Sequence, residues 1–362
     1  MTDDFIRPVL KSLDHYIPGK QEEEVKKEFG LTTVIKLASN ENPFGPSPKA
    51  IEAVSNSIRS ASVYPDQHHT ILREALAKKL NIDKENLIIG NGSDEIMLLI
   101  AQAFLSSQDE AVISKHTFSV YEFVTKVMDG KPVYADLKEH VYDLDAMESK
   151  VSAKTKLVFI CNPNNPTGTY VDKDKLEKFI SRMPMDTIVV IDEAYGNYST
   201  EKDYPKSIEF IHKYPNVIVL QTFSKIFGLA GLRVGYGISN PRIIKYLNLV
   251  KLPFNVNRIG QVAAVAALSD DEFVEKSIKN NEQGKEYLYK ELSALGLTYL
   301  RTQANFICIN FDEDSDRIFL GLMKEGVIVR PLSSFDLPQS IRVTVGTPEQ
   351  NEKFISALKK VL

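Results

Sequence analysis

The sequence has few of the features that mark secreted, membrane-spanning or metal-binding proteins. Its 362 residues include only two cysteines, Cys161 and Cys308, each inside an apolar run, so we expect buried thiols in a reducing cytosol rather than a disulfide framework. No stretch approaches the roughly 20 apolar residues that span a bilayer. The first residues, MTDDFIRPVLKSLDHY, carry acids where a signal peptide needs bases, and they lack its apolar segment. We therefore expect a cytoplasmic protein.

The sequence also lacks metal-binding motifs and a large excess of charge of one sign. The six histidines form no HExxH motif and no cluster with the cysteines, so a metal site is not expected. The net charge of -4 and the pI of about 6.0 give no electrostatic reason to expect nucleic-acid binding. What remains is the composition of an ordinary globular protein, 43% hydrophobic and 25% charged, long enough for one large or two moderate domains.

Short apolar runs alternate with helix-like segments between about residues 85 and 240. Several runs are apolar throughout, which is typical of strands buried on both faces of a mainly parallel sheet. The runs are LIIG at 87–90, AVIS at 111–114, PVYA at 132–135, LVFIC at 157–161, TIVVID at 187–192, VIVLQ at 217–221 and VGYGI at 234–238. Segments between them, such as EIMLLIAQAFL and KDKLEKFISRM, have helical spacing. The pattern predicts an α/β fold with a mainly parallel sheet covered by helices.

The pattern changes after residue 255. Residues 257–294 are rich in helix formers, and FICINF, VIVR and IRVTV are then predicted as strands before a closing helix in EQNEKFISALKKVL. The N-terminal segment is too short to fold alone. We therefore expect a large domain at 45–255 and a smaller α+β domain formed by 1–44 together with 256–362.

Polar residues follow several of the predicted strands at their carboxyl ends, where open α/β sheets bind ligands. The segment NGSDE places Gly92, Ser93 and Asp94 at a strand-to-helix turn, which suits either a bound phosphate or an ordinary N-cap. NPNNPTG, after LVFIC, is either a ligand-binding loop with amide side chains or a surface turn. Asp192 ends the run TIVVID, where a carboxylate needs a cationic partner unless it caps the next helix.

A lysine follows the run VIVLQ at the same edge of the sheet. The stretch TFSKIFGLAGLRVGYG at 222–237 places Lys225 in a short apolar segment. A lone lysine there would usually be a surface residue. Lys225 and the three polar segments are all predicted at the same edge of the sheet, which favours a partly desolvated lysine side chain. Desolvation lowers the pKa of the amine and makes it a nucleophile. An amine, a carboxylate for a pyridinium nitrogen, donors for a phenolic oxygen and a phosphate cup are together what pyridoxal phosphate requires.

Three motifs in this order carry a family resemblance: NPNNPTG, DEAY and TFSKIFGLAGLRVGYG. The chain resembles the fold type I aminotransferases of class I and II over nearly its whole length. Within that family it is most similar to the histidinol-phosphate aminotransferase group, through YIPGK at 16–20, LASNENPFGPSP at 37–48, YPD at 64–66 and IRVTVGT at 341–347.

The resemblance implies a role for each residue of a cofactor site. Lys225 bonds to pyridoxal phosphate and later moves the proton, while Asp192 keeps the ring nitrogen protonated. Phe118 stacks on the ring at a position where many relatives have Tyr. Asn165 and Tyr195 hydrogen-bond to the phenolic oxygen. The 5′-phosphate is surrounded by Gly92, Ser93, Asp94, Ser224 and Arg233, with Thr222 as a further ligand.

The resemblance also implies the substrates. Arg330 and Arg342 match anion-binding arginines of the small domain, although each alone could equally form a surface ion pair. Tyr16 and Asn40 match further substrate contacts. The implied reaction moves an amino group between L-histidinol phosphate and 2-oxoglutarate or glutamate, in histidine biosynthesis.

Tyr64, in SVYPDQHH, matches a tyrosine that reaches the cofactor phosphate of the neighbouring subunit. A homodimer with shared active sites is therefore expected, without nucleic-acid or membrane partners. A phenol suits such a place because its hydroxyl can donate to phosphate while its ring packs in an apolar interface. The alternative is a Tyr-Pro turn on the surface of a monomer.

Other functions compete with this interpretation. An aromatic amino-acid aminotransferase or a phosphothreonine decarboxylase would share the fold. A non-catalytic aminotransferase-like binding module, such as half of a transcription regulator, would need a DNA-binding extension, for which we expect no room. A nicotinamide oxidoreductase would need GxGxxG after an early strand, and GNGSDE lacks the third glycine.

Overall fold

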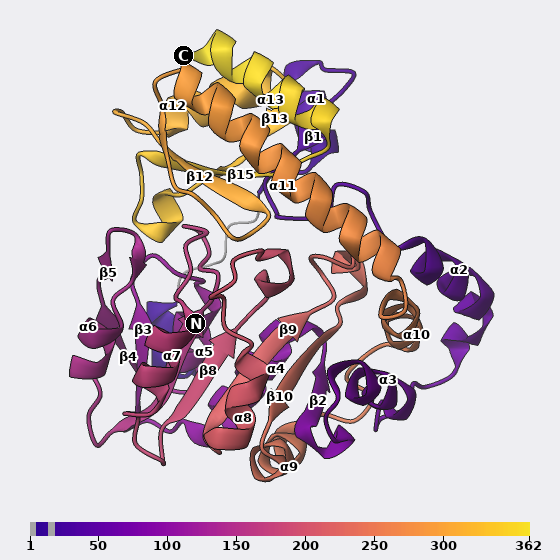
Figure 1. The fold of residues 1–362 in the computed structure, drawn as a ribbon, viewed down its shortest axis with the longest axis vertical. Helices are drawn as coiled ribbons and strands as arrows, with labels where there is room; N and C mark the ends of the chain where they lie inside the picture. The colour runs from indigo at the N-terminus through magenta and orange to yellow at the C-terminus, as the bar shows by residue number, and fades with distance from the viewer. Residues whose placement is uncertain (1–4, 14–18) are drawn as a thin grey trace.

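A seven-stranded sheet forms the centre of the larger part of the molecule (Figure 1). The computed structural model describes residues 5–13 and 19–362. The strand order is β2 (Leu87–Gly90), β10 (Gly235–Ser239), β9 (Val217–Thr222), β8 (Ile188–Asp192), β7 (Thr155–Cys161), β3 (Glu110–Ser114) and β4 (Lys131–Ala135). Strand β10 runs in the opposite direction to the other six strands. All seven predicted strands are confirmed, and the carboxyl ends of the other six meet at one edge.

Helices cover this sheet, and their apolar residues join its strands in one core. The bounds are α2 (Pro48–Ser57), α3 (Thr70–Leu80), α4 (Gly92–Phe104), α5 (Val120–Val127), α6 (Leu144–Ser149), α7 (Lys173–Ile180), α8 (Phe210–Lys213), α9 (Pro241–Val250) and α10 (Arg258–Ala267). A small hairpin, β5 (Leu137–Lys138) with β6 (Val141–Tyr142), lies at the edge near β4. Strands β7, β8 and β9 are buried almost throughout because helices cover both faces. The predicted α/β class is confirmed.

A four-stranded antiparallel sheet forms the smaller part, shown at the top of Figure 1. Its order is β11 (Thr298–Tyr299), β12 (Phe306–Asn310), β15 (Ser340–Thr344) and β14 (Arg330–Pro331). The long helix α11 (Asp271–Ala294) leads into it, and α12 (Asp316–Lys324) and α13 (Pro348–Val361) pack with it. The strands predicted in FICINF and IRVTV and the closing helix are therefore present.

The prediction of one strand in VIVR was wrong. β13 (Val327–Ile328) pairs in parallel with β1 (Ile35–Lys36), whereas β14 pairs with β15. The run is divided because its successive residues bond to two different partners. Helix α1 (Glu22–Phe29) comes before β1, and its Val25 is buried with Met323 and Ile328.

The core of the larger part extends beyond residue 255. It includes Val256, Ala263, Ala264 and Ala267, because α10 packs against α2 and α3. The division of the chain into domains at 45–255 stays a prediction. Within residues 5–13 and 19–362, no helix combines the length and apolar character that crossing a membrane requires.

Candidate active site

A cavity of about 210 Å³ opens where the strand ends meet. Its walls come from the turns after β2, β3, β7, β8 and β9 and from the segment after β1. The lining residues are Ser39, Glu41, Ser93, Asp94, Phe118, Cys161, Asn165, Asp192, Ala194, Tyr195, Thr222, Ser224, Lys225, Ala230 and Arg233. Ten of the predicted site residues therefore line the same cavity.

Lys225 lies three residues beyond the end of β9, on a turn in which Gly228 N–H donates to the Lys225 carbonyl. Its Nζ donates to the carbonyl of Ser39 over 3.2 Å and lies 5.5 Å from the ring centre of Tyr195. Burial, and then the charge of Arg342, lowers the pKa of the Lys225 amine to about 8. About a tenth of the amine is therefore neutral and nucleophilic at pH 7, and about half of it at pH 8.

Asp192 is the last residue of β8, and its side chain is only 3% exposed. One carboxylate oxygen accepts from the Tyr121 hydroxyl over 2.7 Å, and the other accepts from Ala194 N–H over 3.1 Å. Burial raises the pKa of Asp192 to about 6, although both hydrogen bonds oppose the rise. The carboxyl group is therefore mostly charged at pH 7, and it faces the cavity with acceptor sites left for a cation.

Asn165 and Tyr195 lie on the turns after neighbouring strands, β7 and β8. The guanidinium of Arg342 donates to Asn165 Oδ1 and, over 2.8 Å, to the carbonyl of Ala38. The Tyr195 hydroxyl accepts a 2.9 Å hydrogen bond from the Asn40 amide. Burial raises the pKa of Tyr195 to about 12, so its hydroxyl remains protonated and can donate to a ligand oxygen.

Phe118 follows β3 and forms another wall of the cavity. Its ring packs edge-on against Tyr121 with the centroids 5.7 Å apart. The ring is partly buried, so it offers an apolar surface to a flat ligand.

Hydroxyl groups and a guanidinium gather at the N-terminus of α4. Ser93 and Asp94 are in its first turn. The Ser224 hydroxyl lies 3.0 Å from that of Thr222, and Arg233 donates to Ser224 over 3.4 Å and to Asp94 over 3.3 Å. A helix N-terminus with hydroxyls and an arginine is a ready site for a phosphate group.

Two glycines make this cup possible. Gly92 has a φ of 79°, and a Cβ there would overlap the Arg233 guanidinium. A Cβ on Gly235 would overlap the backbone nitrogen of Ser93. The close approach of β10, Arg233 and α4 therefore needs a residue without a side chain at both positions. This phosphate cup fits the phosphate group of pyridoxal phosphate. The Asp192 carboxylate fits its ring nitrogen, and the Lys225 amine fits its aldehyde carbon.

The remaining predicted residues lie outside the cavity wall that the described residues form. Asn40 and Arg342 contact wall residues through the hydrogen bonds above, and Arg330 is the cross-strand partner of Arg342. Tyr64 is 77% exposed and stacks on Phe254 with the centroids 4.8 Å apart. Tyr16 falls outside the described residues. The substrate roles of Asn40, Arg330 and Arg342 stay predictions.

Sequence reasoning missed several residues of the site. Ser39 and Glu41 line the cavity from within the segment LASNENPFGPSP, whose similarity to relatives was the available signal. Cys161, Ala194 and Ala230 are small residues with no individual signal. Tyr121 does not line the cavity, and its sequence context indicates only an apolar residue of a helix. The described part of the chain contains no cluster of three or more His, Cys, Asp or Glu side chains that could hold a metal ion.

The chain is similar to known proteins over almost its whole length. Residues 32–358 match the family described as aminotransferase class I and II. A histidinol-phosphate aminotransferase of Moorella thermoacetica is 48% identical over 357 residues, which cover 98% of this chain and 92% of that one. One from Caldicellulosiruptor saccharolyticus is 46% identical over 98% of this chain and 99% of its own. The crystal structure of histidinol-phosphate aminotransferase from Sinorhizobium meliloti in complex with pyridoxal-5'-phosphate has a TM-score of 0.90 at 26% identity, with 99% and 98% of the two chains covered.

Proposed function

The chain belongs to the class I and II aminotransferases and, within them, to the histidinol-phosphate aminotransferases, and we propose that it transfers the amino group of L-histidinol phosphate to 2-oxoglutarate in histidine biosynthesis. The observation that carries this proposal is the single cavity in which a Lys225 amine of lowered pKa, a buried Asp192 carboxylate and an arginine-containing anion cup meet. The relatives at 48% and 46% identity support the choice of substrate.

The cofactor of this reaction is pyridoxal phosphate, and its ring, when bound, supplies an acceptor for the negative charge that develops on the substrate carbon. We assign the cofactor's anchor and the proton-moving amine to Lys225. Asp192 provides the carboxylate for the ring nitrogen, and Phe118 covers one face of the ring. Asn165 and Tyr195 hold the phenolic oxygen in place. Ser93, Asp94, Thr222, Ser224 and Arg233, with Gly92, form the phosphate cup.

The same cleft has to accept two anionic substrates in turn. Arg330 and Arg342 are neighbours across β14 and β15, and guanidinium groups bind both carboxylate and phosphate. Arg342 is 6% exposed and bonded to the cavity residue Asn165, which supports a role for it at the substrate carboxylate or phosphate. Asn40 and Tyr16 complete the proposed substrate contacts.

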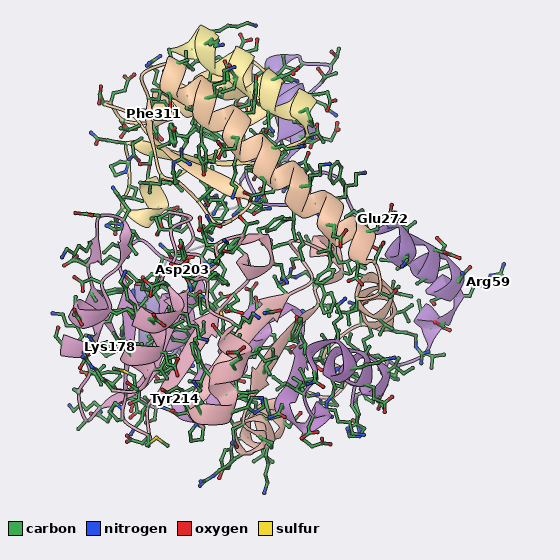
Figure 2. All side chains as sticks on the ribbon, in the orientation of Figure 1. Arg59, Lys178, Asp203, Tyr214, Glu272 and Phe311 are labelled. Atoms are coloured by element: carbon green, nitrogen blue, oxygen red, sulfur yellow. The ribbon has the colours of Figure 1, made fainter. Side chains whose placement is uncertain are left out.

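We further propose a cytoplasmic homodimer that shares its active sites. Exposed apolar side chains gather on α2, on the short helix Ile58–Ser62, and on the loop and helix that follow. They are Ile51, Ile58, Val63, Tyr64 and Ile71. In Figure 2, Arg59 marks this end of the molecule. A partner covering this surface would bury Tyr64, whose hydroxyl would then be available to the partner's phosphate cup. Both cysteines are free and buried, which fits a reducing compartment.

A steady-state comparison of amino donors tests the substrate. Histidinol phosphate, phenylalanine and tyrosine are each offered with 2-oxoglutarate. Each hydrogen bond to the phosphate that the aromatic amino acids cannot make typically contributes about 1.5–3 kcal/mol, so kcat/KM should favour histidinol phosphate by about tenfold or more per bond. Equal or higher kcat/KM for phenylalanine or tyrosine would identify an aromatic amino-acid aminotransferase instead.

A further inference from the structure

A fully buried tyrosine lies behind the carboxylate of the proposed cofactor site. Tyr121, in the first turn of α5, is 0% exposed, and its hydroxyl donates to Asp192 over 2.7 Å. Its ring is stacked on Phe159 of β7, with centroids 4.8 Å apart and an interplanar angle of 11°. Phe118 packs edge-on against the same ring. The phenol is therefore held in one position, aimed at one carboxylate oxygen.

The direction of this hydrogen bond is settled by the chemistry of the pair. Burial and the charge of Asp192 hold the pKa of Tyr121 well above its usual value. The phenol therefore stays protonated, so it always donates and never competes for a proton. A buried carboxylate without a donor tends to take up a proton, because burial penalises its charged form.

We infer that Tyr121 is a positioning residue that keeps Asp192 ionised and turned toward the cavity, so that its free acceptor sites meet the ring nitrogen of the cofactor. The inference rests on the proposed function, because it assumes that a pyridine ring lies against Asp192. It goes beyond that function because it assigns the state of the carboxylate to a residue that does not touch the cavity.

Other titratable groups surround Asp192 and have to be separated from Tyr121. They are Asp94 on α4, Cys161 on β7, Glu193 and Tyr195 beside Asp192, Lys225 after β9, and the buried phenols of Tyr142 and Tyr204. Burial raises the pKa of the thiol and of each phenol, so none of them titrates between pH 5 and 8. Glu193 does, because burial raises its pKa to about 7. Lys225, whose pKa burial lowers to about 8, loses its proton in the upper part of the range from pH 5 to 9.

The test measures binding of pyridoxamine 5′-phosphate to the apoprotein by equilibrium dialysis from pH 5 to 9. This probe has the ring nitrogen and the phosphate but cannot bond to Lys225, so its affinity reports the Asp192 contact directly. Tyr121→Phe should weaken it about twofold at pH 7 and about tenfold below pH 6, because a smaller share of the Asp192 carboxyl groups is then charged. Asp192 in this variant loses a donor and takes up its proton at higher pH. When the pH is lowered, the affinity for the probe should therefore begin to fall at a pH about one unit higher than in the wild type.

Controls separate positioning from a merely structural role. Benzyl phosphate has no ring nitrogen, so wild type and Tyr121→Phe should bind it equally. Tyr289→Phe removes another buried phenol hydroxyl, one that accepts from Thr302 N–H over 2.9 Å, and should leave the binding curve unchanged. Adding Glu193→Gln to both proteins should preserve the difference between them. In an Asp192→Asn background, Tyr121→Phe should cause no further loss.

A second variant covers the case in which Tyr121→Phe folds poorly. Phe159→Leu keeps the hydroxyl but removes the ring that holds it, and it should move the curve in the same direction by a smaller amount. The inference is overturned if Tyr121→Phe binds the probe as the wild type does, if benzyl phosphate is weakened equally, or if the loss persists in Asp192→Asn. Failure of the wild type to bind the probe at all would instead overturn the proposed function.

Discussion

The side-chain amide of Asn40 donates to the hydroxyl of Tyr195 over 2.9 Å, across 155 positions of sequence. The same Asn40 accepts from Thr344 over 3.3 Å, and its backbone N–H donates to the Thr344 hydroxyl over 3.0 Å. One buried residue thus connects the segment after β1, the turn after β8 and strand β15.

Asn40→Ala should lower the free energy of unfolding. The variant leaves buried partners unsatisfied, which costs about 1–3 kcal/mol, and it places alanine at a φ of 56°. Asn81→Ala is the matched control, because Asn81 has a φ of 54° and an exposed side chain. Urea unfolding followed by circular dichroism should show a loss for Asn40→Ala that exceeds that of the control by about 1–3 kcal/mol. Equal losses would mean that the backbone conformation alone matters.

Borohydride reduction of the protein with bound cofactor should label Lys225. Peptide mass mapping checks the site, and Lys285, which is buried elsewhere, should stay unlabelled. Lys225→Ala should lose turnover by several orders of magnitude, because the anchoring amine and the proton-moving base disappear together. A label on another lysine, or retained turnover, would refute the assignment.

The attachment of pyridoxal phosphate to the apoprotein should accelerate as pH rises through about 8. The pKa of Lys225 is lowered to about 8, so the neutral, reactive amine becomes the main form above that value. Arg342→Gln removes a positive charge that lowers this pKa, so the midpoint should move to higher pH. Stopped-flow absorbance measures the rates. Arg330→Gln is the comparison and should leave the midpoint in place.

The same two arginine variants test the shared anion site. Each should raise KM for both histidinol phosphate and glutamate by about tenfold or more, since a hydrogen bond to a charged group contributes about 1.5–3 kcal/mol. Initial-rate kinetics with each substrate varied in turn provides the values. If only one substrate is affected in both variants, the two anions do not share a site.

Gly92→Ala should weaken cofactor binding by about tenfold or more. Its Cβ would displace Arg233 from the phosphate cup, and its φ of 79° disfavours any other residue. Gly231→Ala is the control, because a Cβ at Gly231 meets open space and its φ is not in the left-handed region. Equilibrium dialysis with pyridoxal phosphate should separate the two variants, and equal affinities would contradict the proposed cup.

Mixing two inactive or weak variants should restore activity if the sites are shared between subunits. A heterodimer of Tyr64→Ala with Lys225→Ala has one site with a normal Lys225 and a normal Tyr64 from the partner chain. After co-refolding, its activity should exceed that of the Tyr64→Ala homodimer. Sedimentation should give a dimer. A monomer, or no gain on mixing, would show that Tyr64 is only a surface residue.

The strands and the edge of the sheet that carries the site could be predicted because buried parallel strands are uninterrupted apolar runs. The polar motifs after LVFIC, TIVVID and VIVLQ could therefore be placed at one edge from their positions in the chain. Residues that act through a neighbouring side chain could not be predicted in this way. Tyr121 is one apolar residue among several in an amphipathic helix, and only the stacking of its ring on Phe159 of β7 brings its hydroxyl to Asp192. The division of VIVR was also hidden, because sequence does not show that Ile35 would pair with Val327.

The pairing of β1 with β13 also determines when the cavity can be completed. Every strand of the large sheet lies between residues 87 and 239, so that sheet can form while the C-terminal third of the chain is still being synthesised. The strand that precedes Ser39 and Glu41 lacks its pairing partner until Val327 and Ile328 have emerged and paired with Ile35 and Lys36. The last contacts that hold this wall of the cavity therefore form late in biosynthesis, and a chain that stops before residue 327 would build the sheet but leave β1 without its strand partner.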